Sequence, residues 1–252
     1  MDVTVLMMSY KRRPNLAPIM EALGKQTYQP KEIIIFNNEE GITLDIEGAT
    51  VINSDRNFSS MARPAFALLA RTSHVMCHDD DLKLGPKAIE NFVYWMEKLP
   101  GSILGYEGRR LILQSAMPYR RARMEQAKSL LEPREIDVVF AKAMFCETKT
   151  YVYHWELFYR MINPNIQDED ICTSLANQGK GNKNYLIPLM PGAELTVLSD
   201  RGVALSGRPG YWGERDFVTN EALRATRRGR WAEARAEGLL LGDEHQAPEA
   251  GF

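Results

Sequence analysis

Cysteine is scarce in this chain, and the few cysteines that it has are scattered. They stand at Cys77, Cys146 and Cys172, an odd number without a CxxC spacing, which excludes a disulfide scaffold and a cysteine-based zinc site. No apolar run approaches the about 18 residues that a membrane span needs. The basic cluster near the N-terminus follows the apolar stretch instead of preceding it, which is the wrong order for a signal peptide. We therefore expect a soluble, cytoplasmic protein.

An excess of one charge sign is also lacking. The chain carries 31 Lys and Arg residues against 33 Asp and Glu residues, for a net charge of -2. Bulk charge alone therefore cannot hold a polyanion, although a local basic patch remains available. The GxSxG, phosphate-loop and GxGxxG motifs are missing as well, so we expect none of the sites that these motifs build.

The first hundred residues alternate strand and helix patterns. Val3–Met8 is a continuous apolar run, which is typical of a strand buried on both faces. Pro14 and Gly24 bound a segment whose apolar residues recur at helical spacing. Such alternation favours a mostly parallel sheet with right-handed crossovers. The further elements that it predicts are strands at Glu32–Phe36, Thr50–Asn53 and His74–Cys77, and helices over Met61–Ala70 and from Pro86 through Met96.

The second half of the chain is less regular. Residues 190–213 are rich in Gly, Pro and Ser and lack a period, which predicts a long functional loop. We expect this half to complete the same sheet in one α/β domain over residues 1–240, and residues 241–252 to be a disordered tail. The elements predicted here are strands at Ser102–Tyr106, Val138–Thr148 and Tyr185–Leu189, and helices at Tyr153–Met161, Asp168–Gln178 and Glu214–Ala236.

Three consecutive carboxylates, Asp79, Asp80 and Asp81, follow a predicted buried strand. Ligands of open parallel sheets bind beyond the carboxyl ends of the strands, and three like charges need a cation or a hydrogen-bond network to compensate them. Mg²⁺ and Mn²⁺ prefer oxygen ligands and bind through one or two carboxylates together with the phosphates of a substrate. A solvated acidic turn is the alternative, but the preceding strand favours a metal and diphosphate site.

Two further segments carry candidate polar groups. DRNFSSMARPAF places Arg63 near the start of a helix, where backbone N–H groups and a guanidinium suit an anionic phosphate. IQDEDICTSLANQ places Asp168, Glu169 and Asp170 in the first turn of another helix. These carboxylates either complement the helix dipole, or one of them faces the metal site as a catalytic base or charge stabiliser.

Near the C-terminus, SGRPGYWGERDF combines glycines with Tyr211, Trp212 and Arg215. A flexible segment with aromatic rings suits closing over a sugar or a base by stacking and cation–π contact, and a surface loop pinned by one buried tryptophan is the alternative. RATRRGRWAEAR then predicts a basic helix, which is either a solvated face or a contact to a phosphate backbone.

These segments, in this order, resemble the nucleotide-sugar-dependent glycosyltransferases of the GT-A fold. The nearer resemblance is to glycosyltransferase family 64, the exostosin C-terminal domain type, and the more distant one is to family 2. The segments that carry it, over residues 3–225, are VTVLMMSYKRRPNL, EIIIFNN, the DxD-like HDDD, SILGYEGRR, DEDICTSLA and SGRPGYWGERDF. The resemblance implies a Rossmann-like, mostly parallel central sheet flanked by helices, with a nucleotide-sugar-binding half (1–105) and an acceptor-binding and catalytic half (106–240).

The resemblance also implies a role for each matching residue. Asp81 falls on the metal ligand, with Asp79 beside it as a second ligand and as a contact to the nucleotide. Asp170 falls on the catalytic carboxylate, with Glu169 next to it, and Arg215 on an arginine that binds the diphosphate and assists catalysis. Further residues implied are Ser9, Tyr10, Arg12, Asn37, Asn38, Arg63 and Asp80 for the nucleotide sugar, and Tyr211, Trp212 and Arg109 for the acceptor and its loop.

The activity implied is metal-dependent transfer of a hexosyl or N-acetylhexosaminyl group from a UDP-sugar to a hydroxyl acceptor, with Mn²⁺ or Mg²⁺ bridging the diphosphate to Asp81. The expected acceptor is a glycan or a glycan precursor. A hydroxymethylated base in DNA is the alternative acceptor, which the Arg-rich C-terminal helix favours. A non-catalytic nucleotide-sugar-binding module is a further alternative. A sugar-phosphate nucleotidyltransferase is disfavoured because SYKRRPN contains no glycine.

Overall fold

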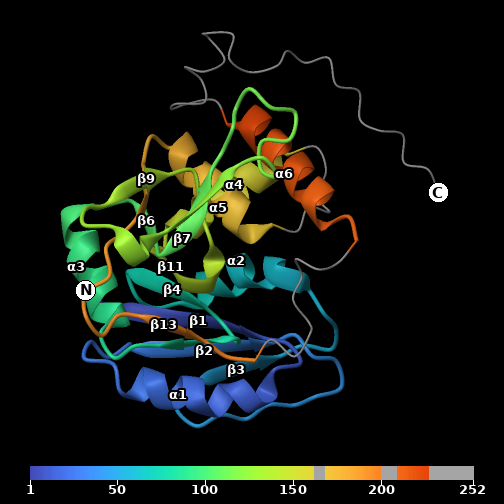
Figure 1. Ribbon diagram of the computed structural model, residues 1–252. Helices are drawn as coiled ribbons and strands as arrows, with labels where there is room; N and C mark the ends of the chain where they lie inside the picture. Colours follow the sequence, from blue (N-terminus) through green and yellow to red (C-terminus); the bar gives the residue numbers. More distant parts are fainter. Residues whose placement is uncertain (162–167, 200–208, 227–252) are drawn as a thin grey trace.

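The computed structural model describes residues 1–161, 168–199 and 209–226. Within them, eight strands form one central sheet, in the order β3-β2-β1-β4-β11-β6-β12-β9 (Figure 1). The bounds of these strands are β1 Val3–Ser9, β2 Glu32–Asn37, β3 Thr50–Asn53, β4 His74–Asp79, β6 Ile103–Gly105, β9 Arg134–Ile136, β11 Met144–Glu147 and β12 Asn184–Leu186.

The strands of the first half are all parallel to one another. β1 pairs in parallel with β2 and β4, and β2 pairs in parallel with β3. β11 then runs antiparallel to both β4 and β6, and β12 is parallel to β6 but antiparallel to β9. The carboxyl ends of β1, β2 and β4 therefore meet at one edge of the sheet.

Two smaller sheets lie beside the central one. In the first, β7 pairs antiparallel with both β10 and β8. In the second, β13 pairs antiparallel with β5 and so returns a late segment of the chain to the end of the aspartate triplet. Their bounds are β5 Leu82–Leu84, β7 Glu107–Arg110, β8 Arg123–Gln126, β10 Val138–Val139 and β13 Leu195–Val197.

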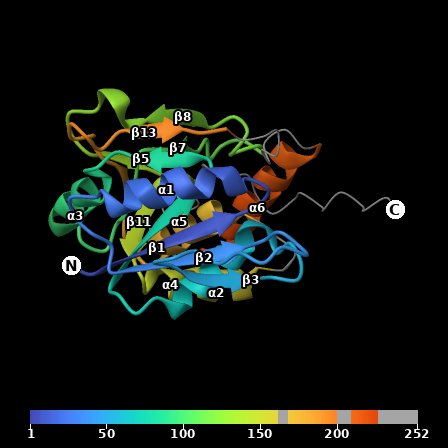
Figure 2. The same cartoon turned by 90° about the horizontal axis from the view of Figure 1, so that it is seen from below.

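Helices cover both faces of the central sheet (Figure 2). α1 and α3 share one hydrophobic cluster with one face of β1, whereas α2 and the start of α4 share another cluster with the opposite face. α4, α5 and α6 pack on one another in a third cluster. The bounds are α1 Leu16–Gly24, α2 Ala62–Phe66, α3 Ala88–Lys98, α4 Thr150–Arg160, α5 Glu169–Gly179 and α6 Tyr211–Ala225.

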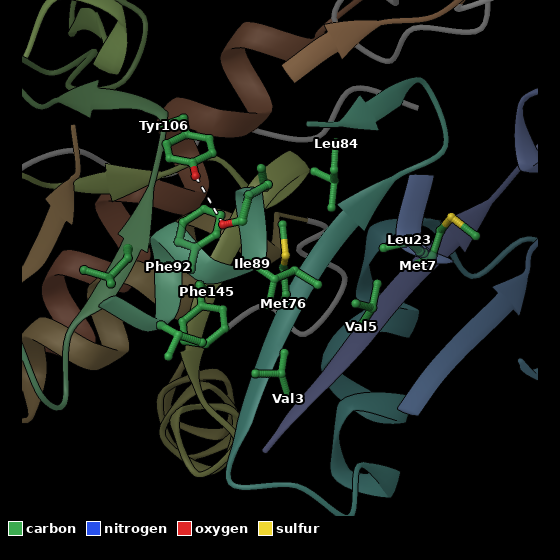
Figure 3. Packing of buried hydrophobic residues seen from close by; sticks show 14 of the residues in the cluster. Val3, Val5, Met7, Leu23, Met76, Leu84, Ile89, Phe92, Tyr106 and Phe145 are labelled. Atoms are coloured by element: carbon green, nitrogen blue, oxygen red, sulfur yellow. Dashed lines mark hydrogen bonds between the residues drawn. The ribbon is translucent and has the colours of Figure 1, made fainter. Parts of the chain in front are cut away.

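The continuous apolar run of β1 exists because both faces of the strand are buried. Val3, Val5 and Met7 face the cluster that also holds Phe92 of α3, while Leu6 points into the opposite cluster (Figure 3). Burying a side chain of this size contributes about 1.5–3 kcal/mol. The prediction of a mostly parallel central sheet flanked by helices in one domain is confirmed. No helix among the described residues combines the length and apolarity that crossing a bilayer requires.

Several predicted elements of the second half were wrong in detail. Val138–Thr148 is not one strand, because the chain leaves β10 through a 3-10 turn at Ala141–Ala143 before it enters β11 in another sheet. The predicted loop 190–213 contains β13, and α6 already begins at Tyr211. β8 and β9 were not predicted. In the first half, the helix expected over Met61–Ala70 is shorter, with α2 lying between two 3-10 turns.

Part of the predicted C-terminal region lies outside the described residues. The helix expected over Glu214–Ala236 is described only up to Ala225, where α6 ends. The expected tail at 241–252, and most of the predicted basic helix, lie beyond Thr226 and are not described.

Candidate active site

The aspartate triplet lies where the carboxyl ends of three parallel strands meet. β4 ends at Asp79, and the register places Met8 of β1 opposite Asp79 and Ser9 opposite Asn37 of β2. Three predicted segments, which are far apart in the chain, are thereby brought to one edge of the sheet. This edge is where open parallel sheets bind their ligands.

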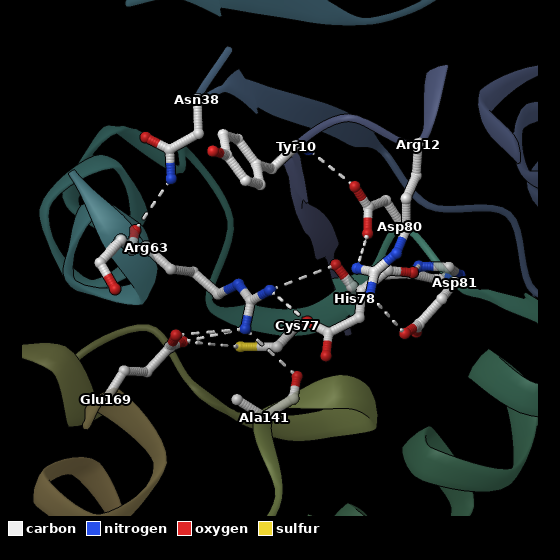
Figure 4. A network of polar contacts seen from close by, with 12 residues as sticks. Tyr10, Arg12, Asn38, Arg63, Cys77, His78, Asp80, Asp81, Ala141 and Glu169 are labelled. Atoms are coloured by element: carbon white, nitrogen blue, oxygen red, sulfur yellow. Dashed lines mark hydrogen bonds and ion pairs between the residues drawn. The ribbon is translucent and has the colours of Figure 1, made fainter. Parts of the chain in front are cut away.

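The middle aspartate of the triplet binds the loop that follows β1. Asp80 Oδ2 accepts a hydrogen bond from the backbone N–H of Tyr10 at 2.7 Å, and Arg12 Nη1 donates to Oδ1 at 2.7 Å (Figure 4). Lys11, between these two donors, has a φ of 59°, so the loop turns sharply to aim both groups at one carboxylate. Burial raises the pKa of Asp80 to about 6, although both donors act in the opposite direction.

Arg63 connects the triplet to the second acidic segment. Its Nη2 donates to Asp79 Oδ1 at 2.6 Å, and its Nη1 donates to both carboxylate oxygens of Glu169 at 3.2 Å. The arginine is only 2% exposed and Glu169 only 1%. Burial raises the pKa of Glu169 to about 8, against the effect of Arg63. The predicted phosphate-binding arginine thus already binds two carboxylates, and Glu169 has no access to a substrate in this structure.

Arg215 forms a second cluster with the other two carboxylates of the same segment. Its Nη1 donates to Asp168 at 2.8 Å, and its Nη2 lies 2.7 Å from both oxygens of Asp170. The guanidinium also lies over the rings of Tyr119, at 4.4 Å, and Tyr211, at 5.4 Å. The predicted diphosphate arginine and the predicted catalytic carboxylate are therefore brought together, and they are bound to each other.

Arginines and aromatic rings alternate beside this cluster. The guanidinium of Arg109, in β7, lies 4.8 Å from the ring centroid of Tyr119 and 5.1 Å from that of Trp212. Its Nη1 also donates to the carbonyl of Ala122 at 3.0 Å. Tyr211 and Trp212 belong to the first turn of α6 and not to a loop. Arg109, the third residue predicted to contact the acceptor, comes from a different element, β7.

The two asparagines predicted near the nucleotide base are bonded within the protein. Asn37 Nδ2 donates to the carbonyl of Ile42 and to Asn53 Oδ1. Asn38 Nδ2 donates to the carbonyl of Ser59, and its Oδ1 accepts the backbone N–H of Phe58. These bonds shape the loops that follow β2 and β3. Ser9, at the end of β1, is also buried.

Asp79 and Asp81 are the carboxylates of the triplet that remain partly exposed. Burial and the charge of Asp79 both raise the pKa of Asp81, which a nearby cation would reverse. Within the ranges that the structure describes, no group of three or more His, Cys, Asp or Glu residues is arranged to hold a metal alone. Two partly exposed carboxylates, of which Asp81 lies 3.4 Å from Arg12, are oxygen donors of the kind through which Mg²⁺ or Mn²⁺ binds together with substrate phosphates.

Sequence reasoning missed the residues that hold these groups in place. Asn15 Nδ2 donates to the carbonyls of Asp80 and Ser199, and Asp216 Oδ1 accepts the backbone N–H groups of Tyr119 and Arg120. Asn15 and Asp216 stand in segments that carry the family resemblance, but their residue types did not indicate a role. Asp168, by contrast, was among the three carboxylates predicted in the acidic first turn.

The fold and this edge of the sheet define an α/β protein of the GT-A type. Residues 4–170 match the model of "Glycosyl transferase family 2", and the chain belongs to this family. Family 2 was the more distant resemblance drawn from the sequence, and the nearer one, family 64, has no support from this match. No protein of curated function matches the sequence closely enough to count as a relative.

Solved structures show the same fold. TarS of S. aureus (residues 1–349) in complex with UDP-GlcNAc superposes with a TM-score of 0.64 at 13% identity, over 95% of this chain and 70% of that one. The TarS complex with UDP gives 0.60 at 13% identity, with the same coverage. GalNAc-T7 with UDP, GalNAc and Mn²⁺ gives 0.58 at 12% identity, over 83% of this chain. The match spans only 45% of the GalNAc-T7 chain.

Proposed function

We propose that the protein transfers a sugar from a UDP-sugar to a hydroxyl acceptor in a metal-dependent reaction. The observation that carries this proposal is the network around Arg63, which joins the aspartate triplet at the end of β4 to the acidic first turn of α5. The two carboxylate sets lie far apart in the chain and meet at the ligand-binding edge of the sheet. Membership of family 2 supports the reaction class, and the UDP-bound structures with the same fold support the donor.

Asp81 and Asp79 would hold Mn²⁺ or Mg²⁺, which supplies positive charge to the diphosphate. The GalNAc-T7 structure, crystallised with UDP and Mn²⁺, supports the choice of metal. Tyr10 and Arg12, in the loop after β1, would line the nucleotide site, while Asp80 would hold that loop in place. Four of the predicted donor-binding residues would not contact the donor directly but would support the backbone around it, because their side chains are buried or hydrogen-bonded within the protein. These residues are Ser9, Asn37, Asn38 and Arg63.

Asp170 is the proposed catalytic carboxylate. The acceptor oxygen would form a bond to the anomeric carbon while the bond between that carbon and the diphosphate oxygen breaks, and UDP would leave with the electron pair. The hydroxyl proton would pass to Asp170 if the configuration inverts. Arg215 binds both oxygens of Asp170, so it would orient this group, and it would offer a positive charge near the leaving group.

The donor sugar is proposed to be a hexose or an N-acetylhexosamine, and the protein to act in the cytoplasm. The acceptor proposed from the resemblance is a glycan or a glycan precursor, with a hydroxymethylated DNA base as the second candidate. Tyr211, Trp212 and Arg109 lie beside Asp170 and Arg215 and would contact either acceptor. A surface that favours the second candidate is described below.

A thermal-shift screen of UDP-, GDP- and TDP-sugars with and without Mn²⁺ tests the donor site. We expect stabilisation that needs both the metal and one UDP-sugar, because metal and diphosphate bind together. Asp81→Ala should abolish this shift, whereas Glu156→Ala, at an exposed position on α4, should leave it unchanged. Release of UDP in the same samples separates an enzyme from a non-catalytic binding module. The absence of a shift with every donor would overturn the proposal.

A further inference from the structure

An arginine-rich segment lies next to the proposed catalytic carboxylate. Residues 109–123 contain five arginines and no acidic residue, in a chain whose net charge is -2. They form the end of β7, the loop that follows it and the first residue of β8. Figure 1 shows this loop, in green, rising beside α6.

Among the described residues, three of these arginines, Arg109, Arg121 and Arg123, have no acidic partner, and Arg109 donates to a backbone carbonyl instead. Arg110 pairs with Glu125 at 3.0 Å, and Arg120 lies 3.4 Å from Asp216. Arg121 and Arg123 are exposed, and none of the ion pairs found among the described residues involves either of them. Their guanidinium groups therefore face solvent as available cations. Charges left in this way suit an anionic ligand better than a neutral one.

The segment is fixed to the proposed active site by specific contacts. Asp216 of α6 accepts the backbone N–H groups of Tyr119 and Arg120 at 3.0 Å and 2.9 Å. The neighbouring residue of α6, Arg215, binds Asp170 and lies over the ring of Tyr119. The loop residues Tyr119 and Arg120 are therefore held beside the cluster that contains Asp170.

Exposed aromatic rings accompany the cations. Trp212, in the first turn of α6, is 38% exposed and lies against Arg109. Phe217, further along the same helix, is 37% exposed. Cations that follow a backbone, together with rings on which bases stack, are the features that bind single-stranded nucleic acid. A polyol phosphate would use the cations alone, and a neutral glycan would need none of them.

We propose that the exposed surface formed by residues 109–123 and the first turns of α6 binds a single DNA strand that carries the acceptor hydroxyl. The phosphates would contact Arg121 and Arg123, and a base would stack on Trp212 and present its hydroxyl toward Asp170. The inference rests on the proposed function and selects DNA over the glycan as acceptor. A single strand exposes its bases, so no base has to be extruded from a duplex.

Binding of a fluorescein-labelled single-stranded 20-mer, followed by anisotropy over a series of KCl concentrations, tests the inference. We expect the affinity of the unaltered protein to fall steeply with salt, because phosphate contacts release counterions. The double variant Arg121→Glu/Arg123→Glu should bind at least about tenfold more weakly and reduce the salt slope by about 2, one for each lost phosphate contact.

The double variant Lys25→Glu/Lys31→Glu is the matched control. It changes the net charge by the same amount, and both lysines are exposed. Lys31 precedes β2 at the amino edge of the sheet, and Lys25 follows α1, so both lie away from the site. We expect less than about a twofold change in DNA affinity for this control. An equal loss in both variants would mean that bulk charge alone holds the DNA, and would overturn the inference.

Two competitors distinguish the polymer. Poly(glycerol phosphate) at equal phosphate concentration should displace the DNA only weakly, since it has no bases to stack on Trp212. If it competes as well as unlabelled DNA does, the inference fails. Failure of the inference also differs from failure of the proposed function. If a UDP-sugar gives a metal-dependent thermal shift but DNA binding does not depend on salt, only the DNA acceptor is ruled out. If no UDP-sugar gives a thermal shift, the proposed function and the DNA acceptor are both ruled out.

Discussion

The two buried arginines of this protein make similar contacts but serve different parts of it. Arg63 and Arg215 each bind two carboxylates: Arg63 binds Asp79 and one carboxylate of residues 168–170, whereas both carboxylates that Arg215 binds come from residues 168–170. Arg63 is enclosed by backbone carbonyls and by the sheet, while the guanidinium of Arg215 lies over two tyrosine rings. Arg63 therefore joins the two halves of the domain, whereas Arg215 joins α6 to the proposed catalytic residue.

This difference separates a structural ion pair from one that we propose to be functional. Glu169 is almost inaccessible, so it cannot contact a substrate. Its pair with Arg63 can affect the site only by holding β4 and α5 together. Asp170 is the next residue and points to Arg215, beside side chains that remain partly exposed. Neighbouring carboxylates in one helical turn thus face opposite sides, one the interior of the sheet edge and the other the proposed acceptor side.

Arg63→Met should have the largest effect on stability, because it leaves Glu169 buried without its charged partner. We expect the free energy of unfolding to fall by about 3–5 kcal/mol, as measured by urea denaturation. Arg71→Met is the control, since the side chain of Arg71 is 86% exposed and its pair with Glu32 should contribute less than about 1 kcal/mol. A loss no greater than that of the control would show that the Arg63 pair does not hold the two halves together.

The same variant has a predictable pH dependence. Burial raises the pKa of Glu169 from its ordinary value of 4.5 to about 8 in the folded protein, so folding favours the protonated form. The contribution of Glu169 to the free energy of unfolding therefore falls as the pH rises from about 4.5 to about 8. This contribution should fall more steeply in Arg63→Met, where no guanidinium opposes the rise in the pKa of Glu169. Unfolding free energies at both ends of this window measure the effect, and a pH-independent difference between variant and wild type would contradict it.

Asp170→Asn breaks the Arg215 cluster without changing its shape. We expect UDP release from the donor to slow by about 100- to 10,000-fold, because the amide cannot accept the acceptor proton. The metal-dependent thermal shift with the UDP-sugar should persist, since the donor site keeps Asp79 and Asp81. Glu156→Gln makes the same chemical change on the exposed side of α4 and should leave turnover intact. Turnover close to wild type in Asp170→Asn would remove the residue from the mechanism.

Arg215→Lys sharpens the comparison, because it keeps the charge but loses the fork that binds Asp168 and Asp170 together. We expect a loss of about 1–3 kcal/mol in unfolding free energy, since a lysine cannot replace both hydrogen-bonded contacts. Arg224→Lys, on the same helix with a single partner in Glu221, is the matched control and should cost less. Equal losses would mean that the geometry of Arg215 is unimportant for stability.

Trp212→Leu should have the smallest effect. The variant removes one ring from Arg109, a contact that contributes about 0.5–1 kcal/mol at a partly exposed site. Arg109 would keep its other ring and its hydrogen bond to Ala122, so its position should survive. Thermal or urea unfolding measures the change. A loss as large as that of Arg215→Lys would show that the stack supports the whole Arg215 cluster.

The first half of the fold could be predicted from the sequence because its interactions are local and periodic. Val3–Met8, Glu32–Phe36 and Thr50–Asn53 each follow or precede a helix, and the continuous apolar run of Val3–Met8 marks a strand buried on both faces. The second half could not be predicted in the same way. Strands as short as Val138–Val139 and Arg134–Ile136 have too few residues to show a hydrophobic period. Whether such segments form strands depends on the partner strands with which they pair in the folded chain.

The candidate site shows the same division. The sequence alone determined the chemical groups: an aspartate triplet after a buried strand, an acidic helix start and arginines near both. Tertiary structure alone decided which arginine binds which carboxylate, because Arg63 and Glu169 are separated by 106 positions and Arg215 and Asp170 by 45. A guanidinium selects its partners by distance and burial in the folded chain, and linear spacing contains neither. The types of residue at the site were therefore readable in advance, and their pairing was not.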